Sequence, residues 1–275
     1  MLKFYFKRIL NNRMALTGLT LVLVLIAMAL SCQYLAPSDP NLQNLPERLS
    51  APSFKFWMGT DDLGRDIFSR MLYGARVSLS VGFIAVTLST ILGTLIGLLS
   101  GYCGGKVDAV IMRFVDVLLC FPTFFLILMV IAFLEPSILN VMAIIGLTSW
   151  TSLARLVRAE TLSIREREYI LAAKSMGLSH ARIVFVHILP NVMAPILVSA
   201  TLGVGSAILV ESSLSFLGLG VQPPMSSWGG MLTTGKDYIH FAWWLSLFPG
   251  LAILLTTLAF NLLGEGLQSV LDPKE

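Results

Sequence analysis

The sequence predicts an all-α polytopic membrane protein with six transmembrane helices. Of its 275 residues, 56% are hydrophobic and only 13% are charged, whereas soluble domains average about 45–50% apolar and about 25% charged residues. The mean hydropathy is +0.81. Apolar stretches close to 20 residues long recur along the chain, and a helix of about that length crosses a hydrocarbon core about 30 Å thick. The composition therefore excludes a soluble globular protein.

Six apolar stretches define the expected spans, and segments rich in Gly, Ser and Pro separate them as turns. In chain order the spans are Leu16–Leu35, Val77–Leu99, Val110–Leu134, Ile138–Leu153, Val192–Val210 and Trp244–Leu263. Pro122 lies inside the third stretch and removes a backbone hydrogen bond, so we expect a kink there. Arg113 and Asp116 lie three residues apart near the inner end of this span and are expected to pair.

The spans divide the chain into three parts. Residues 1–35 hold a cytoplasmic N-terminus and the first span, residues 36–76 form a long extracytoplasmic loop, and residues 77–275 form a core with five spans. Within the loop, Thr60 or Asp61 is expected to cap the start of a helix. The segment 155–191 carries three arginines among its first eleven residues, which places it outside the bilayer and makes it the largest cytoplasmic segment.

Loop charges predict the orientation of the chain, because basic residues accumulate on the cytoplasmic side of short loops. If the N-terminus is inside, 13 of the 19 Lys and Arg residues lie on the inner side, and these are Lys3, Lys7, Arg8, Arg13, Lys106, Arg113, Arg155, Arg158, Arg165, Arg167, Lys174, Arg182 and Lys274. Most of the others share the 36–76 loop with several acidic residues. The count predicts that both termini are cytoplasmic.

The middle of the cytoplasmic segment reads as two short helices. Residues 168–176 are mostly strong helix formers, and Gly177 follows them where a left-handed C-terminal cap is expected. Ser179 is placed to cap a second helix, which we expect Pro190 to end. Two helices joined at a glycine form a rigid mount. From the residues alone, a loop lying on the membrane and a protein-docking element are equally compatible with this pattern.

The same segment resembles the EAA loop of permease subunits of bacterial ABC importers. The matching residues are Ala172, Ala173, Gly177, Ile188, Leu189 and Pro190. One position departs from the pattern, because Leu171 stands where the family has glutamate and Glu168 lies one turn earlier. Three further strings, at 59–70, 214–224 and 260–273, resemble the second (C-type) subunit of the dipeptide, oligopeptide and nickel permease family.

This resemblance implies a type I ABC importer permease fold, with a cytoplasmic coupling helix between spans 4 and 5. It implies that the chain docks an ATPase through Glu168, Ala172, Ala173, Gly177, Leu189 and Pro190. The implied partners are a second homologous permease subunit in a heterodimer, two cytoplasmic ATPase subunits and an extracytoplasmic solute-binding protein. ATP and Mg²⁺ belong to the ATPase subunits, so we expect neither a catalytic residue nor a bound cofactor on this chain, which is placed in the bacterial inner membrane.

The expected function is to form half of a translocation path for di- or oligopeptides. Import of nickel or a metal chelate is the alternative, although no cluster of metal ligands is visible in the spans. A secondary transporter driven by an ion gradient is a more distant alternative, because such carriers show repeated halves and buried acids near mid-span. Glu211, the one acid at the outer end of the fifth span, is a candidate for the path. The scattered basic residues do not indicate a nucleic-acid partner.

Overall fold

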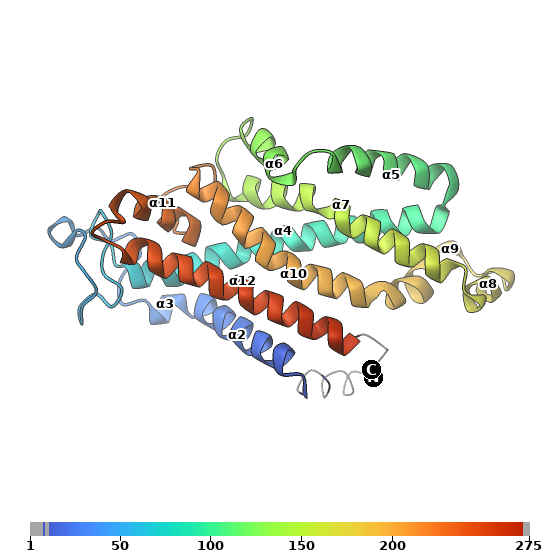
Figure 1. The fold of residues 1–275 in the computed structure, drawn as a ribbon, viewed down its shortest axis with the longest axis horizontal. Coiled ribbons are helices and arrows are strands. Elements are labelled where there is room, and N and C mark those ends of the chain that lie inside the picture. The colour runs from blue at the N-terminus through green and yellow to red at the C-terminus, as the bar shows by residue number, and fades with distance from the viewer. Residues whose placement is uncertain (1–7, 9–10, 272–275) are drawn as a thin grey trace.

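The computed structural model describes residue 8 and residues 11–271, and its regular elements are helices (Figure 1). Lys3, Lys7 and Lys274, which entered the charge count, lie outside the described residues. Long helices run along the bundle: α2 (Arg13–Leu30), α4 (Ile67–Cys103), α7 (Ile138–Arg165), α10 (Leu189–Phe216) and α12 (Trp244–Leu271). Figure 1 shows the loop that follows α3 (Cys32–Leu35) at one end of the bundle, together with α11 (Trp228–Tyr238). We call this the outer end, and the opposite end the inner end.

The structure confirms the all-α polytopic fold. Five described helices are long and apolar enough to cross a membrane, and α5 (Gly105–Leu119) together with α6 (Thr123–Ile131) makes a sixth span if the pair is counted as one. The pair bends by 82° at the break before Pro122. The kink predicted at this proline is confirmed, but the chain divides into two helices there, because Pro122 lacks the N–H that would continue α5 and is instead the N-cap residue of α6.

Several helix ends differ from the sequence prediction, and the start of α4 is one of them. α4 begins at Ile67, ten residues before the expected Val77, and the N-cap is Asp66, whose carboxylate accepts a hydrogen bond from Ser69 N at 2.8 Å. The expected cap at Thr60 or Asp61 is therefore wrong. The reason is local: Asp61 Oδ1 accepts hydrogen bonds from the backbone N–H groups of residues 63 and 65, and Gly64, at φ +72°, turns the chain.

The sequence separated the segment 155–191 from the fourth span, but α7 continues to Arg165. The first arginines of that segment thus lie on the inner end of a membrane helix. Asp116 pairs there with Arg155 of α7 at 3.2 Å, and no ion pair joins it to Arg113 among the described residues. The predicted pairing of Arg113 with Asp116 is therefore wrong, because a partner on the neighbouring helix takes its place.

Glycines allow α4 and α7 to pack backbone against backbone. Gly93, Gly97 and Gly101 recur at every fourth residue of α4, and a β-carbon built on each would meet a backbone carbonyl oxygen of α7 at 2.6–2.9 Å. Gly146 of α7 approaches α4 in the same way, since its β-carbon would lie 2.9 Å from the Ala85 carbonyl oxygen. Small residues at this spacing are the usual means of close helix packing in lipid, where no hydrophobic force draws helices together.

The first and last spans also approach closely. A β-carbon on Gly18 of α2 would lie 2.8 Å from Leu263 Cα, and one on Gly266 of α12 would lie 2.5 Å from Ala15 Cα. α10 lies against both α4 and α12, and their shared interior is a cluster of buried apolar residues that includes Val81, Ile145, Ile208, Leu214 and Phe260. The first residues of α2 and the last residues of α12 therefore lie together at the inner end of the molecule (Figure 1).

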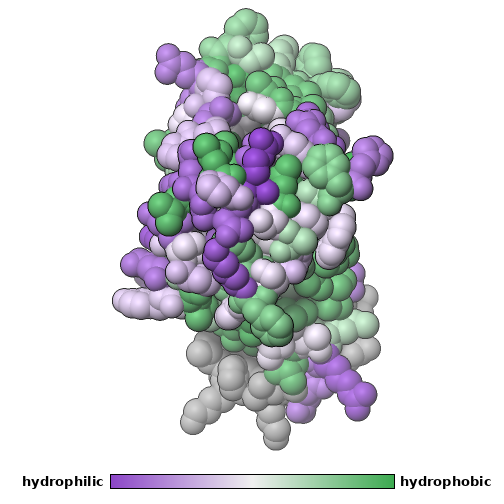
Figure 2. Space-filling model, turned by 90° about the vertical axis from the view of Figure 1, so that its left-hand side faces the viewer, coloured by the Kyte–Doolittle hydropathy of each residue, from purple (hydrophilic) through white to green (hydrophobic). Residues whose placement is uncertain are grey.

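Figure 2 looks onto the outer end and shows hydrophilic side chains gathered there, with apolar side chains along the flanks above and below. Large apolar residues are exposed on the sides of the spans, among them Leu23, Leu95, Phe125 and Leu254. Such a distribution is what a lipid-facing bundle requires, because hydrocarbon solvates apolar side chains as well as a protein core does.

Candidate functional site

The inner end carries a compact feature that we call the knob. It consists of α8 (Glu168–Ser175), α9 (His180–Arg182) and the π-helical turn η2 (Ile183–Ile188), which lie beyond the end of α7 in Figure 1. Gly177 has φ +75°, so the predicted left-handed glycine is confirmed. Ser179 Oγ accepts a hydrogen bond from Arg182 N at 3.4 Å, so the predicted cap is confirmed as well.

The predicted end of the second helix at Pro190 is wrong. The helix passes from α9 through η2 into α10, and residues His180–Phe216 form one apolar helical run. Pro190 sits in the first turn of α10, directly after the π-helical turn η2. Leu189 N donates to Val184 O, five residues back, so the wider π turn carries the chain past the proline. The knob is therefore continuous with a transmembrane helix.

Apolar contacts hold α8 against this helix. Ile170 and Ala173 are buried and belong to a cluster with Ile164 of α7 and with Ile183 and Ile188 of η2. Two inward side chains three residues apart fix one face of a helix. α8 thus packs against α7 and η2 through one face, and its opposite face points outward.

The residues predicted to dock an ATPase do not all face outward. Glu168, Ala172, Gly177 and Pro190 are exposed, Leu189 is half-buried, and Ala173 is buried within the knob. Three exposed apolar side chains were missing from that prediction, and they are Tyr169, Leu171 and Met176, the last 72% exposed. Their exposure could have been predicted from their positions in the helical repeat, because they lie between and beside Ile170 and Ala173, which mark the buried face. Exposed apolar residues on a rigid mount mark an interaction surface.

Next to the knob, an ion pair and its hydrogen-bond partner connect the inner ends of α4, α5 and α7. The Arg158 guanidinium of α7 grips the Asp108 carboxylate of α5 with two nitrogens, Nη2 lying 2.5 Å from Oδ2. Ser100 of α4 donates to the same carboxylate. Arg165 Nη1 donates to the carbonyl oxygens of Gly101 and Tyr102 at the last turn of α4, at 3.3 and 3.2 Å, where a cation is favoured by the helix dipole.

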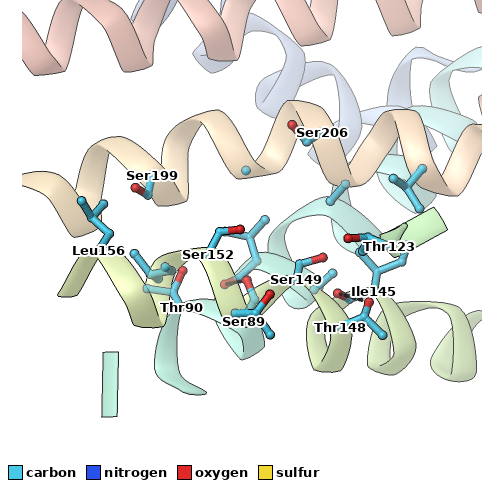
Figure 3. Close-up of a pocket in the computed structure, with 17 residues that line it drawn as sticks. Ser89, Thr90, Thr123, Ile145, Thr148, Ser149, Ser152, Leu156, Ser199 and Ser206 are labelled. Atoms are coloured by element: carbon cyan, nitrogen blue, oxygen red, sulfur yellow. Dashed lines mark hydrogen bonds between the residues drawn. The ribbon is translucent and has the colours of Figure 1, made fainter. Parts of the chain in front are cut away.

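Within the bundle lies a cavity of about 440 Å³ between α4, α6, α7 and α10 (Figure 3). Hydroxyl side chains make up much of its wall, and no charged residue lines it. They are Ser89, Thr90, Thr123, Thr148, Ser149, Thr151, Ser152, Ser199 and Ser206. This cavity was not predicted from the sequence, although four of these residues fall within 148–152, in the middle of α7. Glu211, the residue predicted for the path, is not part of the lining.

Glu211 instead lies in a polar cluster near the outer end of α10, and its side chain is fully buried. Ser215 Oγ donates to its carboxylate at 2.7 Å and Ser78 Oγ of α4 donates at 3.3 Å. The same Ser78 oxygen accepts from Trp228 N at the start of α11, at 3.3 Å. This cluster, which we call the Glu211 cluster, joins α4, α10 and α11. α11 itself was not expected from the sequence.

Polar contacts also fold the outer loop onto the bundle. The Arg65 guanidinium contacts Asp61 at 2.6 Å, and Trp244 Nε1 at the start of α12 donates to the Thr60 carbonyl oxygen at 3.2 Å. Farther out, the Lys55 ammonium lies 2.6 Å from Glu47 and holds the pKa of that carboxyl below its usual value. The loop is therefore an ordered cover of the outer end.

Comparison with known proteins identifies the fold. The family described as binding-protein-dependent transport system inner membrane component matches residues 93–275. The chain belongs to this family. Within this permease the matched residues contain the knob, the inner ion pair, most of the cavity wall and Glu211. A second family, the N-terminal TM domain of oligopeptide transport permease C, matches residues 3–52, which include α2. The permease is therefore a multi-pass protein of the inner membrane.

Relatives cover nearly the whole permease. The dipeptide transport system permease protein DppC of Alkalihalophilus pseudofirmus is 46% identical over 98% of this chain and 88% of its own length. The di/tripeptide transport system permease protein DppC of Pseudomonas aeruginosa is 42% identical over 99% of this chain and 92% of its own. The glutathione transport system permease protein GsiD of Pectobacterium atrosepticum is 44% identical over 98% and 90%.

Proposed function

We propose that this permease forms half of the translocation path of an ATP-driven importer of short peptides. The observation that carries the proposal is the cavity between α4, α6, α7 and α10, whose wall is rich in hydroxyls and free of charged side chains. A hydroxyl both donates and accepts hydrogen bonds, so such a wall suits the amide groups that all peptides share and is indifferent to their side chains. The transport systems named for the relatives handle dipeptides, di- and tripeptides and glutathione, which supports the same substrate class.

The knob supports the proposal that ATP hydrolysis occurs on other subunits. Its outward face carries Leu171, Ala172 and Met176 on a mount fixed by buried isoleucines, which suits insertion into a groove of a cytoplasmic ATPase. One ATPase subunit docks here and a second docks on a homologous permease chain, which completes the path as a heterodimer. ATP and Mg²⁺ are bound by those ATPase subunits. A solute-binding protein delivers peptide to the outer end.

This arrangement requires both termini to be cytoplasmic. The inner end holds the knob together with Arg155, Arg158 and Arg165 on α7, and basic residues favour the cytoplasmic side. Closure of the ATPase pair would then move the knob and α10 as one body, since a single helical run joins them. Such a movement opens the cavity alternately to the two sides of the membrane.

Reconstitution tests the proposal. The permease is placed in liposomes with the second permease, the ATPase subunits and the binding protein encoded beside it, and uptake of a labelled dipeptide is measured. We expect uptake to require ATP on the side of the liposome membrane where the ATPase subunits lie. We also expect uptake to fail when any one subunit is omitted. If the system takes up Ni²⁺ or a nickel chelate but not the dipeptide, the substrate is a metal and not a peptide. Uptake driven by an ion gradient without ATP would overturn the proposal.

A further inference from the structure

A second cavity, of about 830 Å³, lies between the inner end of α4 and the knob. One wall is formed by leucines of α4, and the other comes from α8, α9 and η2. The residues that define it are Leu95, Leu99, Lys174, His180, Val184 and Phe185. Leu95, Leu99 and Phe185 are each about half exposed. The cavity therefore offers an apolar surface that the described part of the chain leaves uncovered.

The rim of this cavity is cationic. Lys174 Nζ lies 5.7 Å from the centre of the Tyr102 ring and forms no ion pair with the described residues. His180 Nδ1 is 2.7 Å from the Tyr102 hydroxyl, which fixes the imidazole at the edge of the apolar wall. Lys174 is the one Lys or Arg among the residues that line this cavity, and none of the lining residues is Asp or Glu. A net positive rim above an apolar wall complements a ligand with an anionic head and a hydrocarbon tail.

We propose that this cavity binds an anionic phospholipid of the inner leaflet, with an acyl chain against Leu95 and Leu99 and the phosphate near Lys174 and His180. The wall belongs to a membrane-spanning helix and the rim to the knob, so the cavity lies where the bilayer meets the cytoplasm in the orientation proposed above. Basic pockets between helices on that side are where anionic headgroups bind. A water-soluble anion would leave the leucine wall exposed, and a zwitterionic lipid carries its own ammonium group, which competes with Lys174 for the phosphate and leaves the pair with a net positive charge.

The position of the site gives the lipid a role in the coupling between the knob and the bundle. Lys174 belongs to α8, whereas the leucines belong to α4, and the Tyr102–His180 contact already spans the two. A phospholipid held between them connects the docking element to the membrane span by a molecule that the bilayer supplies. The ATPase activity of the assembled transporter is therefore expected to depend on anionic lipid.

Native mass spectrometry of the assembled transporter tests the site. The complex is equilibrated with phosphatidylglycerol and with phosphatidylethanolamine of the same acyl chains, and bound lipid is counted. We expect preferential retention of phosphatidylglycerol and a loss of at least about fivefold in apparent affinity for Lys174→Gln, since each cation near a membrane surface contributes about 1 kcal/mol. Lys236→Gln is the matched control, because Lys236 also lies over a ring, that of Phe216 at 5.5 Å, but at the outer end.

A second variant tests the apolar half. Ala181 also lines the cavity. Ala181→Trp, which fills the cavity without removing a charge, is expected to abolish retention of phosphatidylglycerol while leaving the assembled complex intact on gel filtration. Equal retention of both lipids by the native protein, or unchanged retention by both variants, would overturn the proposal. So would a disulfide formed in high yield between Ala181→Cys and a cysteine of a partner subunit, because the cavity would then be a protein interface. Each of these outcomes is independent of whether the transported substrate is a peptide.

Discussion

Gly97 of α4 faces Ala154 of α7 so closely that a β-carbon on the glycine would lie 2.6 Å from the Ala154 carbonyl oxygen. The obstacle is backbone on a neighbouring helix, so it cannot move aside as a side chain would. The same approach is repeated one turn away at Gly93 and at Gly101. The short distance between the backbones of α4 and α7 thus depends on glycine, which has no side chain, at these positions.

Replacing Gly97 with alanine is expected to destabilise the bundle by about 1–3 kcal/mol, the usual cost of overpacking. Thermal unfolding in detergent measures it. Gly250→Ala is the control, because a β-carbon at that position of α12 meets no atom within 4 Å, so it should leave the unfolding temperature unchanged or slightly higher. Equal unfolding temperatures for the two variants would contradict the packing described here.

Arg158→Lys is expected to destabilise the inner end by about 1–2 kcal/mol, because lysine keeps the charge but cannot contact both oxygens of Asp108. The matched control is Arg155→Lys. Arg155 pairs with Asp116 across a site where both side chains are about half exposed, and such pairs contribute about 0–1 kcal/mol. The unfolding temperatures of the two variants should therefore differ, and a larger loss for Arg155→Lys would contradict the stabilising role given to the Arg158–Asp108 ion pair.

Gly177→Val is expected to abolish co-purification of the ATPase subunits while the protein still inserts. A β-branched residue is strained at φ +75°, and a left-handed residue costs about 1–2 kcal/mol even without branching. Gly177→Asn is the control, since asparagine tolerates this conformation, and no atom within 4 Å would meet its β-carbon. If both variants retained the ATPase, the knob would not be the docking element.

Thr90→Phe is expected to reduce peptide uptake roughly tenfold or more, because a ring would occupy the hydroxyl-lined cavity at a cost exceeding about 1.4 kcal/mol. Basal ATPase activity of the complex should persist. Thr87→Phe, one turn earlier on α4 and outside the cavity wall, should transport normally. Normal uptake by Thr90→Phe in the reconstituted system would remove this cavity from the path.

Glu211→Ala is expected to destabilise the permease by about 1–3 kcal/mol, because the buried hydroxyls of Ser78, Ser212 and Ser215 would lose their acceptor. Glu211→Gln, which keeps an acceptor oxygen, should cost less. Unfolding temperature and peptide uptake are measured on the same preparations. A stable Glu211→Ala protein that fails to transport would favour the role in the path that the sequence suggested.

The spans and the turn at Gly177 could be predicted because each depends on local chemistry. A run of about 20 apolar residues is stable as a helix across a lipid bilayer, and a glycine that follows strong helix formers commonly adopts the left-handed conformation that ends a helix. Pro190 misled the prediction for the opposite reason. Proline does end helices in general, but here it occupies the first turn of α10, after a π turn that no local pattern announces.

Long-range partners were the other limit. Asp116 was assigned to Arg113 because they are neighbours on one helix, whereas the fold offers it Arg155 from another. The cavity and the Glu211 cluster escaped detection for the same reason, since their hydroxyls come from three or four helices. Serines spaced along several apolar spans were the available signal, and only the assembled bundle shows which of them meet.

The continuous helical run His180–Phe216 has a mechanical consequence. At about 1.5 Å per residue it is about 55 Å long. It starts in the knob and contributes Ser199 and Ser206 to one wall of the hydroxyl-lined cavity before it reaches Glu211. Because the Glu211 cluster joins the far end of this run to α4 and α11, a displacement of the knob would reach the opposite end of the bundle through a single helix, with no loop in between.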